Sequence, residues 1–165
     1  MQGDDVTAID PEQLRLRPFV AGDDAEVTSW FPDAGALRFF AGRRLSWPLD
    51  DEQWEGIRTD PTITAWTAVL GDDPNPVGHA EIVEETGSRI RFARLAIAPQ
   101  LRGKHLGREM LKNLIAMVRD RGYTQAYLFV HPDNTNAIRG YRSLGFEPVD
   151  EPGLGGGLRM ELGIA

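Results

Sequence analysis

The sequence contains no cysteine among its 165 residues. A disulfide scaffold, a thiolate zinc site, an iron–sulfur cluster and a cysteine nucleophile are therefore excluded, and we predict no metal site. Long apolar runs are also missing, since no segment approaches the roughly 20 apolar residues that a membrane-spanning helix requires. The first ten residues, MQGDDVTAID, have neither a basic start nor an apolar core, so we expect no secretory signal and a cytoplasmic location.

Basic residues are in the minority, with 18 Lys and Arg against 25 Asp and Glu and a formal net charge of −7. Because nucleic-acid-binding proteins are generally basic, we expect no nucleic-acid partner, and no membrane partner either. Hydrophobic residues make up 41% and charged residues 26% of the chain, as in an ordinary globular protein. No linker is visible, so residues 1–165 are predicted to form a single domain.

The charges are unevenly distributed along the chain. Residues 1–60 carry six basic and thirteen acidic side chains, whereas residues 89–121 carry nine basic and two acidic ones. The positive stretch is either a solvated helix face or a site for an anionic ligand. Its basic residues are Arg89, Arg91, Arg94, Arg102, Lys104, Arg108, Lys112, Arg119 and Arg121.

Alternating and β-branched residues predict four strands in the first part of the chain, the last three as an antiparallel meander. These strands cover residues 13–18, 63–70, 77–85 and 90–98. Helices are predicted between the first two strands, from residues 22–24 toward Trp30, over 34–41 and up to Thr59, the last with Asp50 and Gln53 as a capping pair.

The second part of the chain alternates between helices and strands. Leu106 to Val118 have helical spacing, residues 126–130 form an apolar strand, and residues 134–144 form a second helix. Final strands are predicted over 147–149 and 158–164, around a glycine-rich turn at 153–157. A strand, a helix and a strand in series are typical of a right-handed unit with parallel strands, so we predict an α+β fold on a mixed sheet.

Residues 95–111 pass from a strand through a glycine-containing loop into an amphipathic helix. The N-terminus of a helix presents unpaired N–H groups and the positive end of the helix dipole, and glycines let the backbone approach an anion closely. The segment lies inside the positive stretch, which favours an anion site here. It is neither a P-loop nor a Gly-x-Gly-x-x-Gly dinucleotide fingerprint.

A second segment carries five residues at a fixed spacing: Asn134, Ala137, Tyr141, Gly145 and Phe146. The pattern Asn-x-x-Ala-x-x-x-Tyr-x-x-x-Gly-Phe resembles a signature of the GCN5-related N-acetyltransferase (GNAT) superfamily. This segment follows the strand that comes after the helix of the first segment.

The first segment resembles the pyrophosphate motif of the same superfamily, Gln/Arg-x-x-Gly-x-Gly/Ala. It is present as Arg102-x-x-His105-x-Gly107, with a histidine where glycine is usual. Either this backbone position does not need a positive φ angle, or His105 adopts one. The resemblance is specific over residues 93–149 and extends over residues 13–165.

The resemblance implies a mixed α/β sandwich, with a mostly antiparallel sheet that is flanked by helices and whose central parallel strands splay apart. Acetyl-CoA, the implied co-substrate, would lie between these strands, with its pantetheine arm against the backbone of Leu95, Ala96 and Ile97 and the side chain of Asn134. The implied pyrophosphate site is the loop and the start of the helix, at Arg102, Gly103, Lys104, His105, Leu106, Gly107 and Arg108.

The resemblance also implies that Tyr141 is the general acid for the departing thiolate. A general base is needed as well, because a free amine with a pKa of about 10 is mostly protonated at pH 7. Some members of the superfamily carry a glutamate on the fourth strand, but no carboxylate is present in residues 90–95 here. We predict that Glu81, on the preceding strand, is a base that acts through water. The alternative is that Glu81 is only an exposed residue on a solvated face of this strand.

Aromatic residues gather with the acidic residues in the first part of the chain, which favours a cationic or amine-bearing acceptor. The predicted function is direct transfer of an acetyl group from acetyl-CoA to a primary amine of a small cationic molecule or a protein or peptide N-terminus. A non-catalytic acyl-CoA-binding module is the alternative. Transfer of an acyl group longer than acetyl remains an alternative. The protein is either a monomer or a homodimer. The aromatic residues are Trp30, Phe31, Phe39, Phe40, Trp47 and Trp54.

Overall fold

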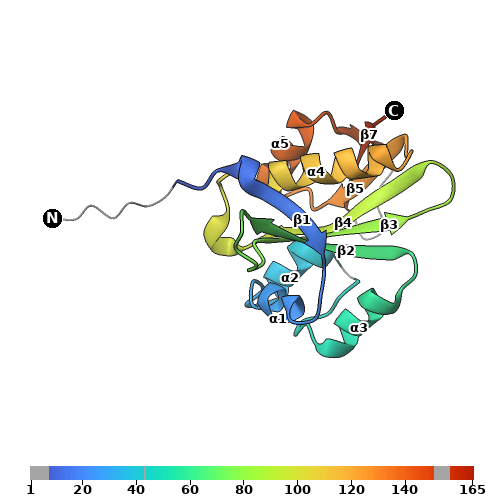
Figure 1. The fold of residues 1–165 in the computed structure, drawn as a ribbon. Helices are drawn as coiled ribbons and strands as arrows, with labels where there is room; N and C mark the ends of the chain where they lie inside the picture. The colour runs from blue at the N-terminus through green and yellow to red at the C-terminus, as the bar shows by residue number, and fades with distance from the viewer. Residues whose placement is uncertain (1–7, 43, 151–156) are drawn as a thin grey trace.

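A computed structural model describes residues 8–42, 44–150 and 157–165 of the chain, which form a sheet with helices on both faces (Figure 1). The strand order in the sheet is β1-β2-β3-β4-β5-β7-β6. The strands are β1 (Leu14–Pro18), β2 (Ile63–Leu70), β3 (Gly78–Glu84), β4 (Arg89–Ile97), β5 (Gln125–Val130), β6 (Glu147–Val149) and β7 (Leu158–Gly163). The helices are α1 (Asp23–Thr28), α2 (Ala34–Ala41), α3 (Asp51–Thr59), α4 (Leu106–Asp120) and α5 (Thr135–Ser143), with 3₁₀ turns η1 (Pro11–Gln13) and η2 (Pro99–Leu101).

The predicted fold class is confirmed. All paired strands are antiparallel except β4 and β5, which are parallel and are joined by α4, as the strand–helix–strand pattern predicted. The meander of β2, β3 and β4 is also as predicted. Most of the predicted glycine-rich turn at 153–157 lies outside the described residues.

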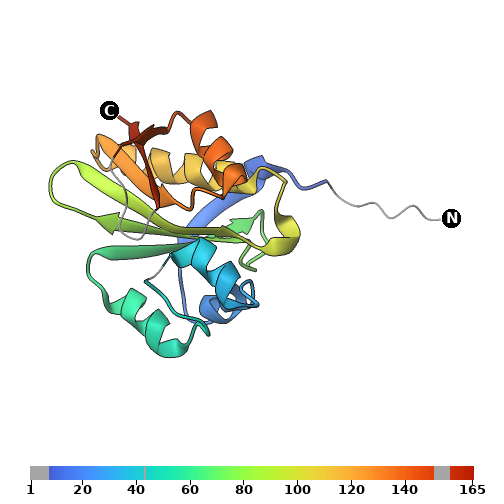
Figure 2. The same ribbon diagram turned by 180° about the vertical axis from the view of Figure 1, so that it is seen from behind.

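Two hydrophobic clusters lie on opposite faces of the sheet. Figures 1 and 2 show α4 and α5 on one face and α1, α2 and α3 on the other. Alternation along β3 sends Ala80 and Ile82 into the cluster under α4, while His79 contacts aromatic rings of the cluster under α1–α3. We call these the α4 face and the α2 face of the sheet.

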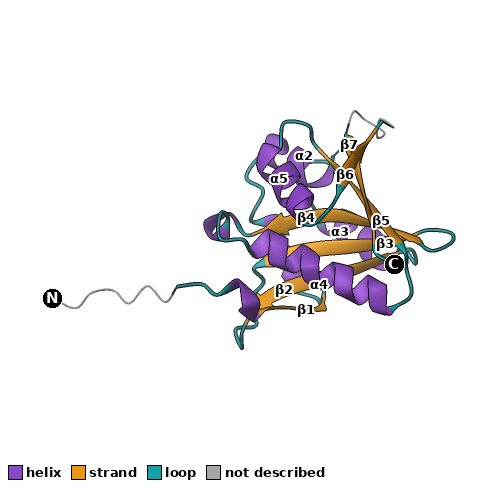
Figure 3. Ribbon diagram, turned by 90° about the horizontal axis from the view of Figure 1, so that it is seen from above, coloured by secondary structure: helices purple, strands orange, loops and turns teal. Residues whose placement is uncertain are grey.

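The pairing of β4 with β5 ends early. The two strands pair only from Arg89 opposite Gln125 to Phe92 opposite Leu128, although β4 continues to Ile97. On the other edge of β4 the register with β3 shifts between His79 and Glu81, and Arg94 has a φ of 47°, in the left-handed region. This bulge bends β4, and Figure 3 shows β4 and β5 diverging. The splayed parallel pair implied by the sequence is present.

Helix caps use several of the acidic residues of the first part of the chain. Asp33 accepts a hydrogen bond from the N–H of Ala36 at the start of α2, and Asp50 accepts one from the N–H of Gln53 at the start of α3. The side chain of Gln53 donates to the carbonyls of residues 46 and 48 instead of closing a reciprocal capping box. The predicted capping pair is therefore confirmed on the Asp50 side only.

Asp23 anchors β1 to α1. Its carboxylate accepts two hydrogen bonds from Arg17, at 2.7 and 2.9 Å, and one each from the Thr67 hydroxyl and the Val20 N–H. Burial by itself would raise the pKa of Asp23, but the hydrogen bonds and the charge of Arg17 outweigh it and lower that pKa.

We expect Asp23→Asn to lower the free energy of unfolding by about 1–3 kcal/mol at pH 7, because the variant loses a charge-assisted pair. A carboxylate with a lowered pKa stabilises the fold above its unfolded pKa of about 3.9, and this contribution is lost as the pH falls through the folded value. Urea titrations from pH 7 to pH 3 should therefore show the two proteins converging. A constant difference across this range would contradict the pairing. Asp24→Asn, which affects a more exposed ion pair with Arg58, is the control.

Candidate functional site

A cavity of about 850 Å³ opens where β4 leaves β5. Its walls come from β4, the loop that follows it, the first turns of α4, one side of α5 and the aromatic side of α2. Every predicted cofactor-binding residue lines this cavity except Lys104, which is an exposed residue of the loop, and Tyr141 lines it as well. Residues that are up to 46 positions apart in the sequence, from Leu95 to Tyr141, are therefore brought to one site.

The edge of β4 forms one wall. Residues 93–97 have no partner strand on the β5 side, because the pairing ends at Phe92. Leu95, Ala96 and Ile97 line the cavity with this edge. An unpaired strand edge can hydrogen-bond an extended ligand as an added strand would, so the structure is consistent with the predicted role of these three residues.

The N-terminus of α4 forms a second wall, and His105 is its cap residue. His105 has φ 63° and ψ 13°, in the left-handed region. Of the two alternatives that the sequence left open, this histidine adopts the positive φ angle. No side chain caps α4, so the first N–H groups of the helix remain available beside the cavity. A Cβ atom on Gly107 would meet only the side chain of Ile97, at 3.6 Å.

Polar side chains link the walls on either side of the cavity. Arg108 of α4 donates to the hydroxyl of Ser143 of α5 over 3.1 Å, and Arg102 donates to the carbonyl of Ile97 over 3.3 Å. Asn134 caps α5 by accepting the N–H of Ala137 through Oδ1, at 3.4 Å. Its Nδ2 group, a pure donor, is the atom left for a ligand. Sequence reasoning did not identify Ser143, although it lies nine residues after Asn134 on the same helix.

Tyr141 reaches the cavity from α5 and is half-buried. Its ring lies 6.1 Å from that of Phe146, and no hydrogen bond of its hydroxyl group is recorded in the described part of the chain. Burial raises the pKa of Tyr141 to about 12. The hydroxyl group is therefore protonated at neutral pH and can donate a hydrogen bond.

Glu81 lies elsewhere, in a fully buried ion pair on the α2 face. Arg94 contacts both carboxylate oxygens, with its Nε atom at 2.7 Å from Oε2, and Nε2 of His79 lies 2.9 Å from the same oxygen. Burial would raise the pKa of Glu81, but the hydrogen bonds from His79 and Arg94 outweigh it and lower that pKa. A carboxylate with a lowered pKa and two occupied oxygens is a weak proton acceptor, so this geometry does not favour Glu81 as the base. Its burial also excludes the alternative of a solvated strand face.

The acidic residues of the first part of the chain do not surround the cavity. Among the described residues that line it none is acidic, whereas Phe31, Phe39 and Phe40 do line it. The acidic side chains act instead as caps and as ion-pair partners away from it, as Asp33 and Asp24 do. Their number in the sequence is thus no guide to the charge of the site.

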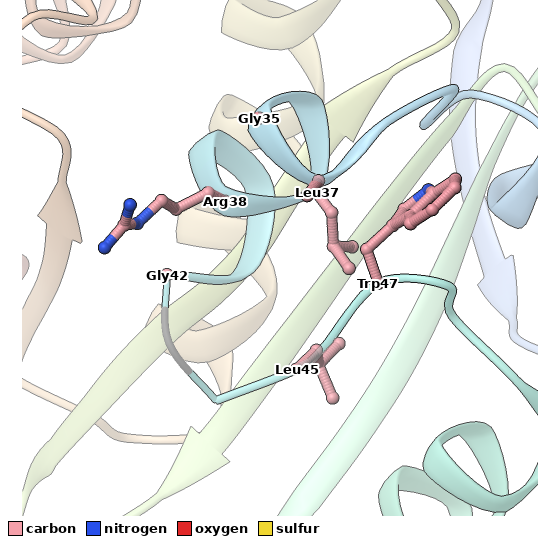
Figure 4. A pocket seen from close by; sticks show the side chains of 7 residues that line it. Gly35, Leu37, Arg38, Gly42, Leu45 and Trp47 are labelled. Carbon is pink, nitrogen blue, oxygen red and sulfur yellow. The ribbon is translucent and has the colours of Figure 1, made fainter.

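A second, open cavity of about 370 Å³ lies on the other side of α2. Figure 4 shows Leu37 and Trp47 pointing toward one another there, while Arg38 points away. Trp47, one of the aromatic residues that favoured an amine-bearing acceptor, lines it, whereas none of the predicted catalytic or cofactor-binding residues does. In the parts of the chain that the structure describes, no group of three metal-ligating side chains is found, and no helix is long and apolar enough to cross a membrane.

The family model of the Acetyltransferase (GNAT) family matches residues 26–146, which is most of the chain. The chain therefore belongs to this family, in agreement with the resemblance of its two motifs. The mycothiol acetyltransferases of Saccharomonospora viridis and Thermobispora bispora are 31% and 33% identical to it, over 85% and 82% of this chain. The chain spans about half the length of these curated relatives, 48% and 47% respectively.

Solved structures show the same fold. A domain from Methanocaldococcus jannaschii superposes with a TM-score of 0.78 at 19% identity, covering 91% of this chain and 97% of that one. AAC(6')-Ib in complex with paromomycin and acetyl-CoA has a TM-score of 0.73 at 22% identity and covers 92% and 93%. Spermidine N-acetyltransferase from Vibrio cholerae, in complex with CoA and spermine, has a TM-score of 0.73 at 20% identity and covers 92% and 95%.

We expect His105→Gly to raise the melting temperature slightly or to leave it unchanged, and to keep cofactor binding. Glycine relieves the strain of the left-handed conformation, which stabilises the folded state by roughly 1–2 kcal/mol. It also increases the conformational entropy of the unfolded chain, which lowers the stability by roughly 0.5–1 kcal/mol. His105→Val is the matched comparison, and it should melt clearly lower because a β-branched residue strains more at this φ angle. A thermal melt of the three proteins tests this. A large loss of affinity for acetyl-CoA in a folded His105→Gly variant would show that the imidazole itself contacts the cofactor.

Proposed function

We propose that the chain is an acetyl-CoA-dependent N-acetyltransferase that transfers the acetyl group directly to a primary amine. One observation carries the proposal: a single cavity joins the unpaired edge of β4, the uncapped N-terminus of α4 and the hydroxyl-bearing face of Tyr141. Membership of the GNAT family supports it, as do relatives that are named acetyltransferases and a structural neighbour solved with acetyl-CoA.

The two ends of acetyl-CoA differ in chemistry, and so do the walls of the cavity. The pyrophosphate is assigned to the N–H groups and cations around Arg102, Gly107 and Arg108, because a helix N-terminus favours an anion. The pantetheine arm, which carries amides, is assigned to the β4 edge and to Nδ2 of Asn134. This orientation leaves the thioester beside the divergence of β4 and β5, where an N–H group of β4 is the oxyanion donor.

Tyr141 is assigned to the departing thiolate. A thiol has a pKa of about 8.5, so complete proton transfer from a hydroxyl group with a pKa of about 12 would be uphill by roughly 5 kcal/mol. Tyr141 therefore stabilises the developing thiolate by donating a hydrogen bond, and the proton finally comes from solvent or from the cationic nitrogen of the tetrahedral intermediate, which loses it as the amide forms. The described lining of the cavity holds no carboxylate, so we assign deprotonation of the amine to water, and the rate should rise with pH up to the pKa of the acceptor.

The acceptor is a primary amine of a small molecule or of a protein or peptide N-terminus. The acidic composition of the first part of the chain favoured a cationic acceptor. The described residues that line the cavity do not support this, because none of them is acidic. The lack of a carboxylate there favours the alternative of a non-catalytic acyl-CoA-binding module. A thiol-release assay with acetyl-CoA and a panel of amines separates the two functions. A single domain, a cytoplasmic location and the choice between monomer and homodimer stay predictions of the sequence.

We expect acetyl-CoA to raise the melting temperature of the protein, because it binds the folded state only. Gly107→Glu should abolish this shift by placing a carboxylate at the assigned pyrophosphate site. Gly107→Ala is the control and should keep most of the shift, since a Cβ atom there makes an ordinary contact with Ile97 at 3.6 Å. A folded Gly107→Glu variant that binds acetyl-CoA like the wild type would show that the cofactor site is assigned wrongly.

We expect Tyr141→Phe to lower kcat by roughly 10–100-fold, with the affinity for acetyl-CoA nearly unchanged. The substitution keeps the ring and its packing against Phe146 and removes only the hydroxyl group. Because a pKa of about 12 keeps Tyr141 protonated, the pH profiles of wild type and variant should have the same shape below pH 10. Steady-state kinetics on an identified amine measure both effects. Wild-type turnover in the variant would leave Tyr141 a packing residue.

A further inference from the structure

The positive stretch of the sequence is divided between the two faces of the sheet. Arg102, Lys104 and Arg108 belong to the loop and helix that border the cavity. Arg89 and Arg91 lie on β4, where the intervening residues Ile90 and Phe92 pack into the cluster under α4. Alternation therefore places both arginines on the α2 face, away from the assigned pyrophosphate site. The cofactor does not account for these charges.

Neighbouring arginines on this face have partners. Arg94 is paired with Glu81, and Arg89 lies 3.6 Å from a carboxylate oxygen of Glu85 and 5.0 Å from the ring centre of Tyr127. Arg44, which acts on Arg91 as a like charge, lies 3.6 Å from Asp60.

Arg91 differs from these arginines. It is half-buried, and within the described residues its guanidinium group has no recorded hydrogen bond or ion pair. Burial lowers the pKa of Arg91, and this effect, together with the like charges of Arg94 and Arg44, outweighs the raising effects of Tyr127 and Glu85. An arginine stays charged even so, and a charge withdrawn from water is normally paired in a folded protein. Removing the Arg91 charge partly from water therefore has an unfavourable free energy, which the binding of an external anion would offset.

The position of Arg91 relates it to the assigned reaction centre. It lies one residue before Phe92, where β4 and β5 diverge, and its partner on β5 is Tyr127. Phe129 follows Tyr127 on the same face of β5 and is 42% exposed, with the two rings 5.7 Å apart. A partly apolar, positively charged surface therefore adjoins the divergence from the side opposite α4.

We propose that Arg91 binds an anionic group of the acceptor, of the carboxylate class. This inference rests on the proposed function, because the acceptor must bring its amine to the thioester beside Leu95. Leu95 is four residues after Arg91 on β4, and because the bulge at Arg94 shortens the strand, at most roughly 13 Å separates them. The amine and the anion of the acceptor are thus on the order of 10 Å apart. The carboxylate of an α-amino acid is too close to its own amine to reach, whereas an extended tripeptide spans this distance.

Triglycine and triglycine amide test the proposal, because they differ only in the terminal carboxylate. The wild type should acetylate triglycine with a kcat/KM at least about 10-fold higher than that of the amide, since a charge-assisted pair forms with only one of them. Arg91→Met keeps the aliphatic stem and should bring this ratio close to 1 by raising KM for triglycine alone. Arg89→Met is the matched control on the same strand face and should keep the wild-type ratio.

Thermal melts separate this role from a structural one. Arg91→Met should melt no lower than the wild type, because it removes an unpaired charge from a half-buried position. Equal rates for the two peptides, a preference that persists in Arg91→Met, or acetylation of neither peptide by a protein that still binds acetyl-CoA would each overturn the proposal and leave acetyl-CoA binding standing. Failure of the wild type to bind acetyl-CoA would overturn the proposed function instead.

Discussion

The buried ion pair between Arg94 and Glu81 underlies the bend in β4, and the cavity depends on that bend. In a regular strand Arg94 would share the α4 face with Ile90 and Phe92. The left-handed backbone at Arg94 turns its side chain onto the α2 face, where Glu81 lies fully buried. A left-handed residue costs about 1–2 kcal/mol, which the hydrogen-bonded pair offsets. We infer that Glu81 acts through the backbone of β4, as a positioning residue for the edge that holds the cofactor.

The sheet also separates two kinds of positive charge. On the α4 side, the N-terminus of α4 and the cations of the loop that precedes it are the site proposed for the phosphates of acetyl-CoA. On the α2 side, Arg91 lies without a partner among the described residues, behind the point where β4 and β5 part. Since the two arginine groups lie on opposite faces, one ligand does not satisfy both. The proposed two-substrate reaction, in which the donor and the acceptor would approach from opposite faces, would account for the arrangement.

The environment of Tyr141 limits what its hydroxyl group can do. Burial raises its pKa to about 12, so the group is a reliable donor and a poor proton source for a thiolate. Thiolates are fair leaving groups, so a hydrogen bond from Tyr141 is sufficient help in the proposed mechanism. The ring of Tyr141 also packs against that of Phe146, so a packing role and the proposed catalytic role are compatible in one residue.

Local patterns in the sequence determined most of the secondary structure. The predicted helix at 34–41 and the predicted strands at 63–70 and 147–149 match α2, β2 and β6, because side-chain periodicity and caps act within a few residues. The resemblance of the two motifs to the family signatures implied the cofactor-binding residues, and a strand–helix–strand unit brings the start of α4 and the start of α5 to one end of the sheet.

Tertiary structure alone decided the charges and the strained positions. Alternation placed Glu81 on the correct face of β3, but only the packing of α1–α3 buries it, and only the bulge brings Arg94 to it. The sequence left two conformations open for His105, and the entry of the chain into α4 selected the left-handed one. The acidic residues of the first part of the chain favoured a cationic acceptor, yet none of the described residues that line the cavity is acidic. The composition gives only the number of charged residues. Their ion-pair and hydrogen-bond partners are determined by contacts between segments that are far apart in the chain.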